Sequence, residues 1–228
     1  MAAGKTVRRY SMFLCGVLCS AVGIAFITRA GLGTSPISGI PFLLSLLTPP
    51  SMGVYTFAFN MLLLAGEALL RRRFSWTQAL QIPITILFSL CIDGALTLIP
   101  TRYGGPYLPS AAYLLVGCLV MAFGIYLEVA ADVIMLPGEA FVRALARKLG
   151  REFGGVKVGF DTVLTLTAAG IALLTFHRLN GVREGTLAAA LAVGQLVRFY
   201  TRRLDGLKAL WLGDDRPAAA AQVSGDAL

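Results

Sequence analysis

The chain has 228 residues, of which 57% are apolar and only 14% are charged, and its mean hydropathy is +0.75. Soluble domains carry about 25% charged residues, so this chain has too few charges to cover a water-facing surface. Its net charge of +8 does not indicate nucleic-acid binding, because the basic residues cluster at the ends of long apolar segments. The composition excludes a soluble domain and predicts an integral membrane protein.

Residues that bind metals or carry out redox chemistry are scarce in the sequence. His177 is the only histidine, and the four cysteines lie inside apolar segments without the paired spacing of metal ligands. We therefore expect no metal, no cofactor and no nucleic-acid partner.

Six apolar windows of about 20 residues predict an all-α protein with six membrane-spanning helices. In chain order the windows are residues 10–29, 53–70, 77–99, 111–131, 156–176 and 185–201. Segments 35–47 and 137–149 are too short to span and are predicted to be re-entrant or interfacial helices. Eight spans would place Arg143 and Arg147 within the bilayer, so six is the better count.

The distribution of positive charge predicts how the chain crosses the membrane. The basic residues of the N-terminus, residues 71–73 and residues 143–151 fall on one side, which we assign to the cytoplasm. Arg102 and Arg183 fall on the external side. Both termini are predicted to be cytoplasmic, with one transmembrane domain over residues 1–204. Residues 205–228 shift to Ala, Asp and Pro, which predicts a disordered tail.

Aligning the chain with itself at an offset of 101 positions indicates an internal repeat. The matched pairs are Gly16 and Gly117, Gly23 and Gly124, Pro36 and Pro137, and Asn60 and Asp161. Each copy holds three spans, an odd number, so residues 111–201 would be inverted relative to residues 10–100. Inverted repeats with broken helices are typical of transporters. The alternative is two unrelated sets of helices that share only their membrane composition.

The first break, residues 30–36, separates the first span from the first short helix. Gly33 permits a non-helical turn, and Ser35 is a preferred N-cap residue. Free backbone N–H groups and the hydroxyls of Thr34 and Ser35, next to Arg29, would attract an anionic group. The alternative is a plain external loop with good helix capping.

The second break carries carboxylates in place of glycines. Glu128 and Asp132 are one helical turn apart, Pro137 opens the second short helix, and Glu139 follows. Carboxylates within or beside a span are costly and usually face a pore, a partner or a cation. For Glu139, an ion pair with Arg143 one turn later is the favoured alternative.

Three further polar residues lie inside spans and are predicted to line a polar pathway. Asn60, Asp93 and Asp161 are expected to face one central cavity together with the hydroxyl groups of residues 30–36. The alternative is that each makes a hydrogen bond between packed helices. Glu67 is expected to pair with the arginine four residues later, which is a structural role.

Two motifs resemble the YczE/YitT-type bacterial membrane proteins. They are Gly31-Leu32-Gly33-Thr34-Ser35-Pro36, after a glycine-rich first span, and Glu184-Gly185-Thr186-Leu187, which opens the last span. The resemblance covers residues 10–204, and that family is similar in length and number of spans. It implies a bacterial inner-membrane location and carries no binding residues over to this chain.

The leading functional hypothesis is a small secondary transporter that moves an organic anion or zwitterion across the inner membrane. The alternative is the substrate-binding membrane subunit of an energy-coupled, vitamin-type importer, which would pack on its partner through small residues such as Ala21 and Ala25. An enzyme is disfavoured, because no Ser/His, His/Glu or paired-Asp arrangement is present. The expected partners are a small-molecule substrate and membrane lipid, and a homodimer is left open.

Overall fold

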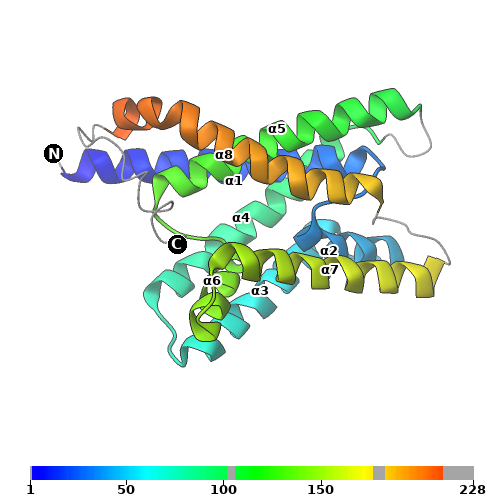
Figure 1. Cartoon of the computed structure of the whole chain (residues 1–228), viewed down its shortest axis with the longest axis horizontal. Coiled ribbons are helices and arrows are strands. Elements are labelled where there is room, and N and C mark those ends of the chain that lie inside the picture. Colours follow the sequence, from blue (N-terminus) through cyan, green and yellow to red (C-terminus); the bar gives the residue numbers. More distant parts are fainter. Residues whose placement is uncertain (1, 102–105, 177–182, 213–228) are drawn as a thin grey trace.

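The computed structural model describes residues 2–101, 106–176 and 183–212, with side chains described from Thr6 to Leu204 within those ranges. Over these residues the chain forms eight α-helices and no strand (Figure 1). The helices are α1 (Ala2–Arg29), α2 (Pro36–Leu47), α3 (Met52–Arg71), α4 (Trp76–Leu98), α5 (Tyr107–Ala131), α6 (Pro137–Leu149), α7 (Phe153–Phe176) and α8 (Glu184–Leu212).

Five helices are long and apolar enough to cross a membrane, namely α1, α3, α4, α5 and α7. The chain is therefore an all-helical, multi-pass membrane protein. The sixth predicted span falls on α8, which is long enough, but Gln195 and Arg198 make its described part less apolar. The predicted count of six spans is thus not confirmed. The short helices α2 and α6 begin within one residue of their predicted starts.

Two helix ends differ from the sequence prediction. α1 begins at Ala2 instead of residue 10, because the basic residues before the apolar window are also good helix formers. α8 continues to Leu212, so residues 205–212 of the predicted tail are helical. The rest of the predicted tail, residues 213–228, and Arg102 lie outside the described residues.

The two short helices follow breaks that share part of their backbone path. Gly31 and Asp132 have positive φ angles of 73° and 47°, in the left-handed region. Ser35 and Leu136 are extended, and a proline then opens each short helix. Proline suits the first helical position, because the N–H it lacks would have no partner within the helix. The breaks differ between these points, because Gly33 has a φ of 131° and Ile134, its equivalent in the second break, has no positive φ.

α1 and α5 cross in antiparallel orientation, and glycines bring their backbones into contact. The contacts are Gly16 with Glu128, Ser20 with Gly124, Gly23 with Met121 and Ile27 with Gly117. A Cβ atom on Gly23 would lie 2.5 Å from the backbone nitrogen of Met121, and one on Gly124 would lie 2.5 Å from that of Ser20. No larger residue fits at this crossing without moving a helix.

The remaining helices are arranged around this crossing in pairs. α4 packs on α1 and α8 packs on α5, while α6 packs on α3 and α2 packs on α7. Figure 1 shows the N-terminus, the turn between α3 and α4, and α6 towards one end of the molecule. The end of α7 and the start of α8 lie towards the other end, together with α2. The two short helices therefore lie towards opposite ends.

Candidate functional site

A cavity of about 250 Å³ lies between α3, α4, the C-terminal end of α5 and the beginning of α6. Half of the residues that line it are ionisable, and four of these, among them Arg143 and Arg147, are exposed. These charged lining residues are Glu67, Arg71, Glu128, Asp132, Glu139, Arg143 and Arg147. We call this space the charged cavity.

The carboxylate side of the charged cavity is held by α5 and α6. Ser20 of α1 donates a hydrogen bond of 2.6 Å from its hydroxyl to Oε1 of Glu128. Glu139 lies in the first turn of α6, where helix packing encloses its carboxyl group. Burial raises the pKa of Glu139 above its usual range, whereas Lys157 and Arg143 lower it. Glu139 therefore retains its proton to a higher pH than an exposed glutamate.

Two buried acceptor atoms belong to residues that line the same cavity. Glu67 is 1% exposed and forms an ion pair of 2.9 Å between its Oε1 and Nε of Arg71. Its Oε2 has no hydrogen-bond partner among the described residues, and neither does Oε1 of Gln81, which is 4% exposed. A buried acceptor without a donor costs about 1–3 kcal/mol. Both atoms are thus suited to accept hydrogen bonds from a ligand or from water.

The basic side of the charged cavity is a face of α6. Arg143 and Arg147 are four residues apart, so their guanidinium groups share one face of this helix. Neither forms an ion pair within the described part of the chain. Guanidinium groups bind carboxylates and phosphates in bidentate geometry. The cavity therefore presents free guanidinium groups and hydrogen-bond acceptors within one small volume.

The first break has a different environment, because it is closed by the start of α8. The backbone N–H of Gly185 donates to the carbonyl of Leu32 at 2.9 Å, and that of Thr34 donates to Oγ1 of Thr186 at 3.2 Å. Gly33 lies directly against Thr186. We call this arrangement the α8 contact. It joins the two motifs on which the YczE/YitT resemblance rests, and sequence reasoning did not foresee their meeting.

The hydroxyl groups of the first break are satisfied within the protein. Thr34 and Thr28 are joined by a hydrogen bond of 3.0 Å between their hydroxyls, and Ser35 donates to Ser38 at 2.9 Å. The Arg29 guanidinium donates through Nη2 to the carbonyl of Leu96, although its buried Nε has no partner. Thr34 and Ser35 are therefore buried, and their hydroxyl groups have hydrogen-bond partners within the protein. Neither residue lines the charged cavity.

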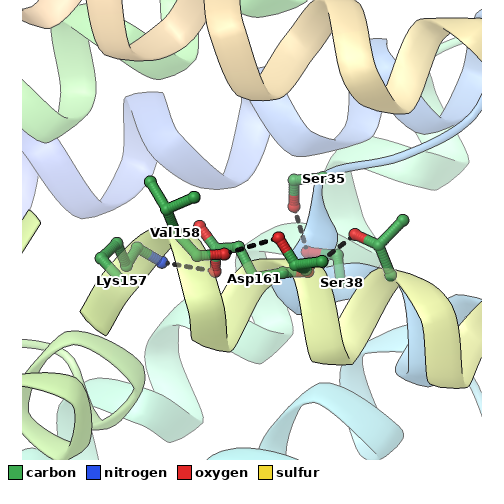
Figure 2. Close-up of polar contacts among 7 residues, drawn as sticks. Ser35, Ser38, Lys157, Val158 and Asp161 are labelled. Carbon is green, nitrogen blue, oxygen red and sulfur yellow. Dashed lines mark hydrogen bonds and ion pairs between the residues drawn. The ribbon is translucent and has the colours of Figure 1, made fainter. Parts of the chain in front are cut away.

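The other predicted site residues are distributed over separate structural contacts. Asn60 donates from Nδ2 to the carbonyl of Thr56 in its own helix at 2.9 Å. Asp161 pairs with Lys157 on α7 at 2.9 Å. Figure 2 shows this pair together with the Ser35–Ser38 hydrogen bond of α2, the helix that packs on α7.

Asp93 of α4 accepts two hydrogen bonds from residues at the beginning of α3. Its Oδ2 accepts a hydrogen bond of 2.6 Å from the Ser51 hydroxyl, and its Oδ1 accepts one of 2.7 Å from the backbone N–H of Gly53. The Gly53 N–H is one of the backbone donors at the start of a helix that lack a partner within it, and Ser51 is the N-cap residue whose hydroxyl accepts from the Val54 N–H. Asp93 therefore caps α3 from a neighbouring helix.

The expectation of one cavity shared by five residues is not met. The structure does not place Thr34, Ser35, Asn60, Asp93 or Asp161 among the residues lining the charged cavity. Asp132 does line it, and α6, which begins at Pro137, supplies one of its walls.

Several residues that line the charged cavity were predicted from the sequence to form structural ion pairs and were therefore not predicted as site residues. Glu67, Glu139 and Arg143 are examples, and Gln81 was not considered at all. One available signal was the spacing of Glu139, Arg143 and Arg147, which places three charges on one face of a short helix. The packing of α6 on α3 had no signal in the sequence.

Comparison with known proteins places the chain in a family without assigning a function. No curated protein and no solved structure matches the chain. The resemblance to the YczE/YitT proteins stays a prediction, because nothing in the comparisons connects the chain to them. One family model matches residues 7–202, which is most of the sequence. The chain thus belongs to the family of unknown function DUF6198.

Proposed function

We propose that the chain is a small secondary transporter that binds an organic zwitterion in the charged cavity and carries it across the bacterial inner membrane. The observation that carries this proposal is the cavity itself, with free guanidinium groups on α6 facing carboxylate and amide oxygens of α3, α4 and α5. An anionic end of the substrate binds Arg143 and Arg147. An ammonium end binds Glu128 and the unpaired oxygens of Glu67 and Gln81.

Two inverted repeats are the architecture that we propose for this transporter. A two-fold axis between two copies makes every contact reciprocal. At the offset of 101, Ser20 corresponds to Met121 and Gly23 corresponds to Gly124. The contact of Gly23 with Met121 is then the equivalent of the contact of Ser20 with Gly124. The contacts of Gly16 with Glu128 and of Ile27 with Gly117 are reciprocal in the same way.

The packing of whole helices supports the same architecture. The pairs α1–α4 and α5–α8 are equivalent, as are α2–α3 and α6–α7, and α2–α7 and α3–α6. Because α1 and α5 cross in antiparallel orientation, the two-fold axis is perpendicular to them and lies in the membrane plane. Transporters built in this way bind their substrate near the interface of the repeats.

Departures from this symmetry suggest which state the structure represents. α3 packs on α4, but α7 has no comparable packing on α8 within the described residues. The charged cavity adjoins the second break, while the α8 contact closes the first. We interpret this as one of two alternating states, in which the site is accessible from the end that contains residues 71–73 and α6. The positive-inside rule assigns that end to the cytoplasm.

Proteoliposome uptake and ligand binding test the proposed function. A thermal-shift screen of the purified chain against amino acids and other small zwitterions should raise its melting temperature, since ligands stabilise the state that they bind. Glu128→Gln and Arg143→Gln should each weaken that binding about ten-fold or more, because each removes a charge that the substrate is proposed to contact. The matched control, Arg203→Gln, changes an exposed cation outside the cavity and should bind normally. Equal binding by all three variants would refute the site.

Topology is tested separately by cysteine labelling in intact cells. Arg72→Cys should be protected from a membrane-impermeant thiol reagent, and Arg183→Cys should be labelled. The endogenous cysteines are first replaced, since four are present. Labelling at position 72 from outside would overturn the proposed orientation, with both termini cytoplasmic.

The substrate-binding subunit of an importer is the second candidate, and one observation favours it. α8 has large exposed apolar side chains, including Leu187 and Leu191 at 66% and 73% exposure, on a helix that α7 does not cover. A partner subunit would bury this surface. Uptake by the purified chain alone under an imposed ion gradient supports the secondary transporter. Uptake only after addition of a co-purifying ATPase module supports the subunit.

A further inference from the structure

A second hollow, of about 450 Å³, lies between the C-terminal ends of α3 and α6. Four of its lining residues are cationic, and none is acidic. The lining residues are Leu70, Arg71, Arg72, Ala144, Arg147 and Lys148. We call this hollow the basic groove.

The charges of the basic groove are largely uncompensated by the protein. Arg71 is paired with Glu67. Arg72, Arg147 and Lys148 form no ion pair with the described residues. Like charges that converge on one hollow repel each other, and a bound anion relieves that repulsion. The groove therefore has the electrostatic character of an anion site.

The surroundings of the groove place it at the boundary between lipid and water. Arg72 ends α3 in a left-handed conformation, at a φ of 53°, directly after the apolar span. Large apolar side chains beside it are strongly exposed, including Leu69 at 79%, Phe74 at 63% and Trp76 at 86%. Tryptophan is enriched at this depth because its ring is amphipathic. Acyl chains can lie along these apolar side chains while a headgroup occupies the groove.

We propose that the basic groove binds the phosphodiester headgroup of an anionic phospholipid, with its acyl chains against the exposed apolar residues of α3 and α4. Basic pockets between transmembrane helices on the cytoplasmic side are suited to such headgroups. A free phosphate offers the same charge, but it makes no use of the apolar rim. The groove shares Arg71 and Arg147 with the charged cavity, whereas Arg72 and Lys148 line the groove alone, so the test substitutes these two residues.

The test measures the melting temperature of the detergent-purified chain with short-chain phosphatidylglycerol, short-chain phosphatidylcholine or inorganic phosphate. Phosphatidylglycerol should raise the melting temperature, and the other two should have little effect. The double variant Arg72→Gln/Lys148→Gln should weaken phosphatidylglycerol binding by about five-fold for each cation removed. The matched control Arg202→Gln/Arg203→Gln removes two exposed cations of α8 and should retain the full response.

Three results would overturn the proposal. Equal shifts with both lipids would show that headgroup charge is not recognised, and an equal loss in the α8 control would show that only net charge matters. A full response to inorganic phosphate would assign the groove to free phosphate instead of lipid. The single variant Lys148→Gln, at an exposed position, provides the same comparison if the double variant does not fold.

Discussion

The two breaks in this chain share several backbone features and have opposite surroundings. In both, a left-handed residue and an extended residue precede a proline that opens a short helix. The first break is lined by glycine and hydroxyl groups and is closed by the α8 contact. The second carries charged side chains and borders the charged cavity. The backbones also differ at Gly33, which has a φ of 131° and lies against Thr186 of α8, whereas Ile134 at the equivalent position has no positive φ.

Side-chain size explains the difference between the breaks. A Cβ atom on Gly185 would lie 2.5 Å from the carbonyl oxygen of Leu32, so this glycine is required for α8 to reach the first break. At the second break the residues that line the adjoining cavity include long charged side chains such as Glu139 and Arg143. Small residues permit contact between backbones, whereas charged residues require a polar space around them.

The largest expected effect is a loss of stability at the crossing of α1 and α5, where the proposed two-fold axis relates the two halves. Gly23→Ala and Gly124→Ala should each destabilise the fold by about 3 kcal/mol, because the new methyl group forces two backbones apart. Similar losses are expected, since the two glycines are equivalent under the proposed repeat. Melting temperatures and yields of folded protein measure the effect. The control is Gly170→Ala, where a Cβ atom meets nothing within 4 Å. A loss of stability in Gly23→Ala with no loss in Gly124→Ala would contradict the two-fold relation.

The next prediction concerns a substitution that should open the first break and leave the second unchanged. Thr186→Val removes the acceptor of the Thr34 N–H, and a buried donor without a partner costs about 1–3 kcal/mol. The melting temperature should fall, and a cysteine at position 35 should become more reactive towards thiol reagents. Thr167→Val is the control, because its hydroxyl only bonds the carbonyl of Val163 in the same helix. Unchanged reactivity at position 35 would show that the α8 contact does not close this break.

The third prediction concerns the carboxyl group of Glu139, which has no titratable equivalent at the first break. The raised pKa of Glu139 means that the folded state binds its proton more tightly than the unfolded state does. Stability therefore falls as pH rises from the usual carboxyl range through the raised value.

Glu139→Gln should remove this contribution to the pH dependence and raise the melting temperature at alkaline pH relative to the unsubstituted protein. Thermal melts from pH 4 to pH 9 provide the measurement. The position equivalent to Glu139 in the first repeat is Ser38, so Ser38→Ala serves as the non-titrating control. Parallel pH profiles for Glu139→Gln and the unsubstituted protein would contradict the assignment.

The smallest effect is expected at a carboxylate outside the cavity. Asp161→Asn loses a partly exposed ion pair with Lys157 and also relieves the repulsion between Asp161 and Glu139, so the change in stability should be less than about 0.5 kcal/mol. Zwitterion binding by the folded variant should be nearly unchanged. A large loss of binding at constant stability would instead support the original prediction of Asp161 as a site residue.

The helices themselves were predictable from the sequence, because their signals are local. Apolar runs located the long helices, and Pro36 and Pro137 located the starts of the short ones to within one residue. The offset of 101 positions also identified the glycines that meet where α1 crosses α5. Hydropathy, glycine and proline act over a few residues, so no knowledge of tertiary contacts was needed.

The tertiary structure alone decided which polar groups meet. From the sequence, Asp93 was a candidate for a polar pathway, yet it caps α3 because α4 packs beside the start of that helix. Glu139 was assigned to a local ion pair, yet the packing of α6 on α3 brings it to a cavity shared with Glu67 and Glu128. A charge can be recognised in the sequence as costly to bury. Its partner is set by which helix faces it across the fold, and helices far apart in the chain come together through packing that no local pattern encodes.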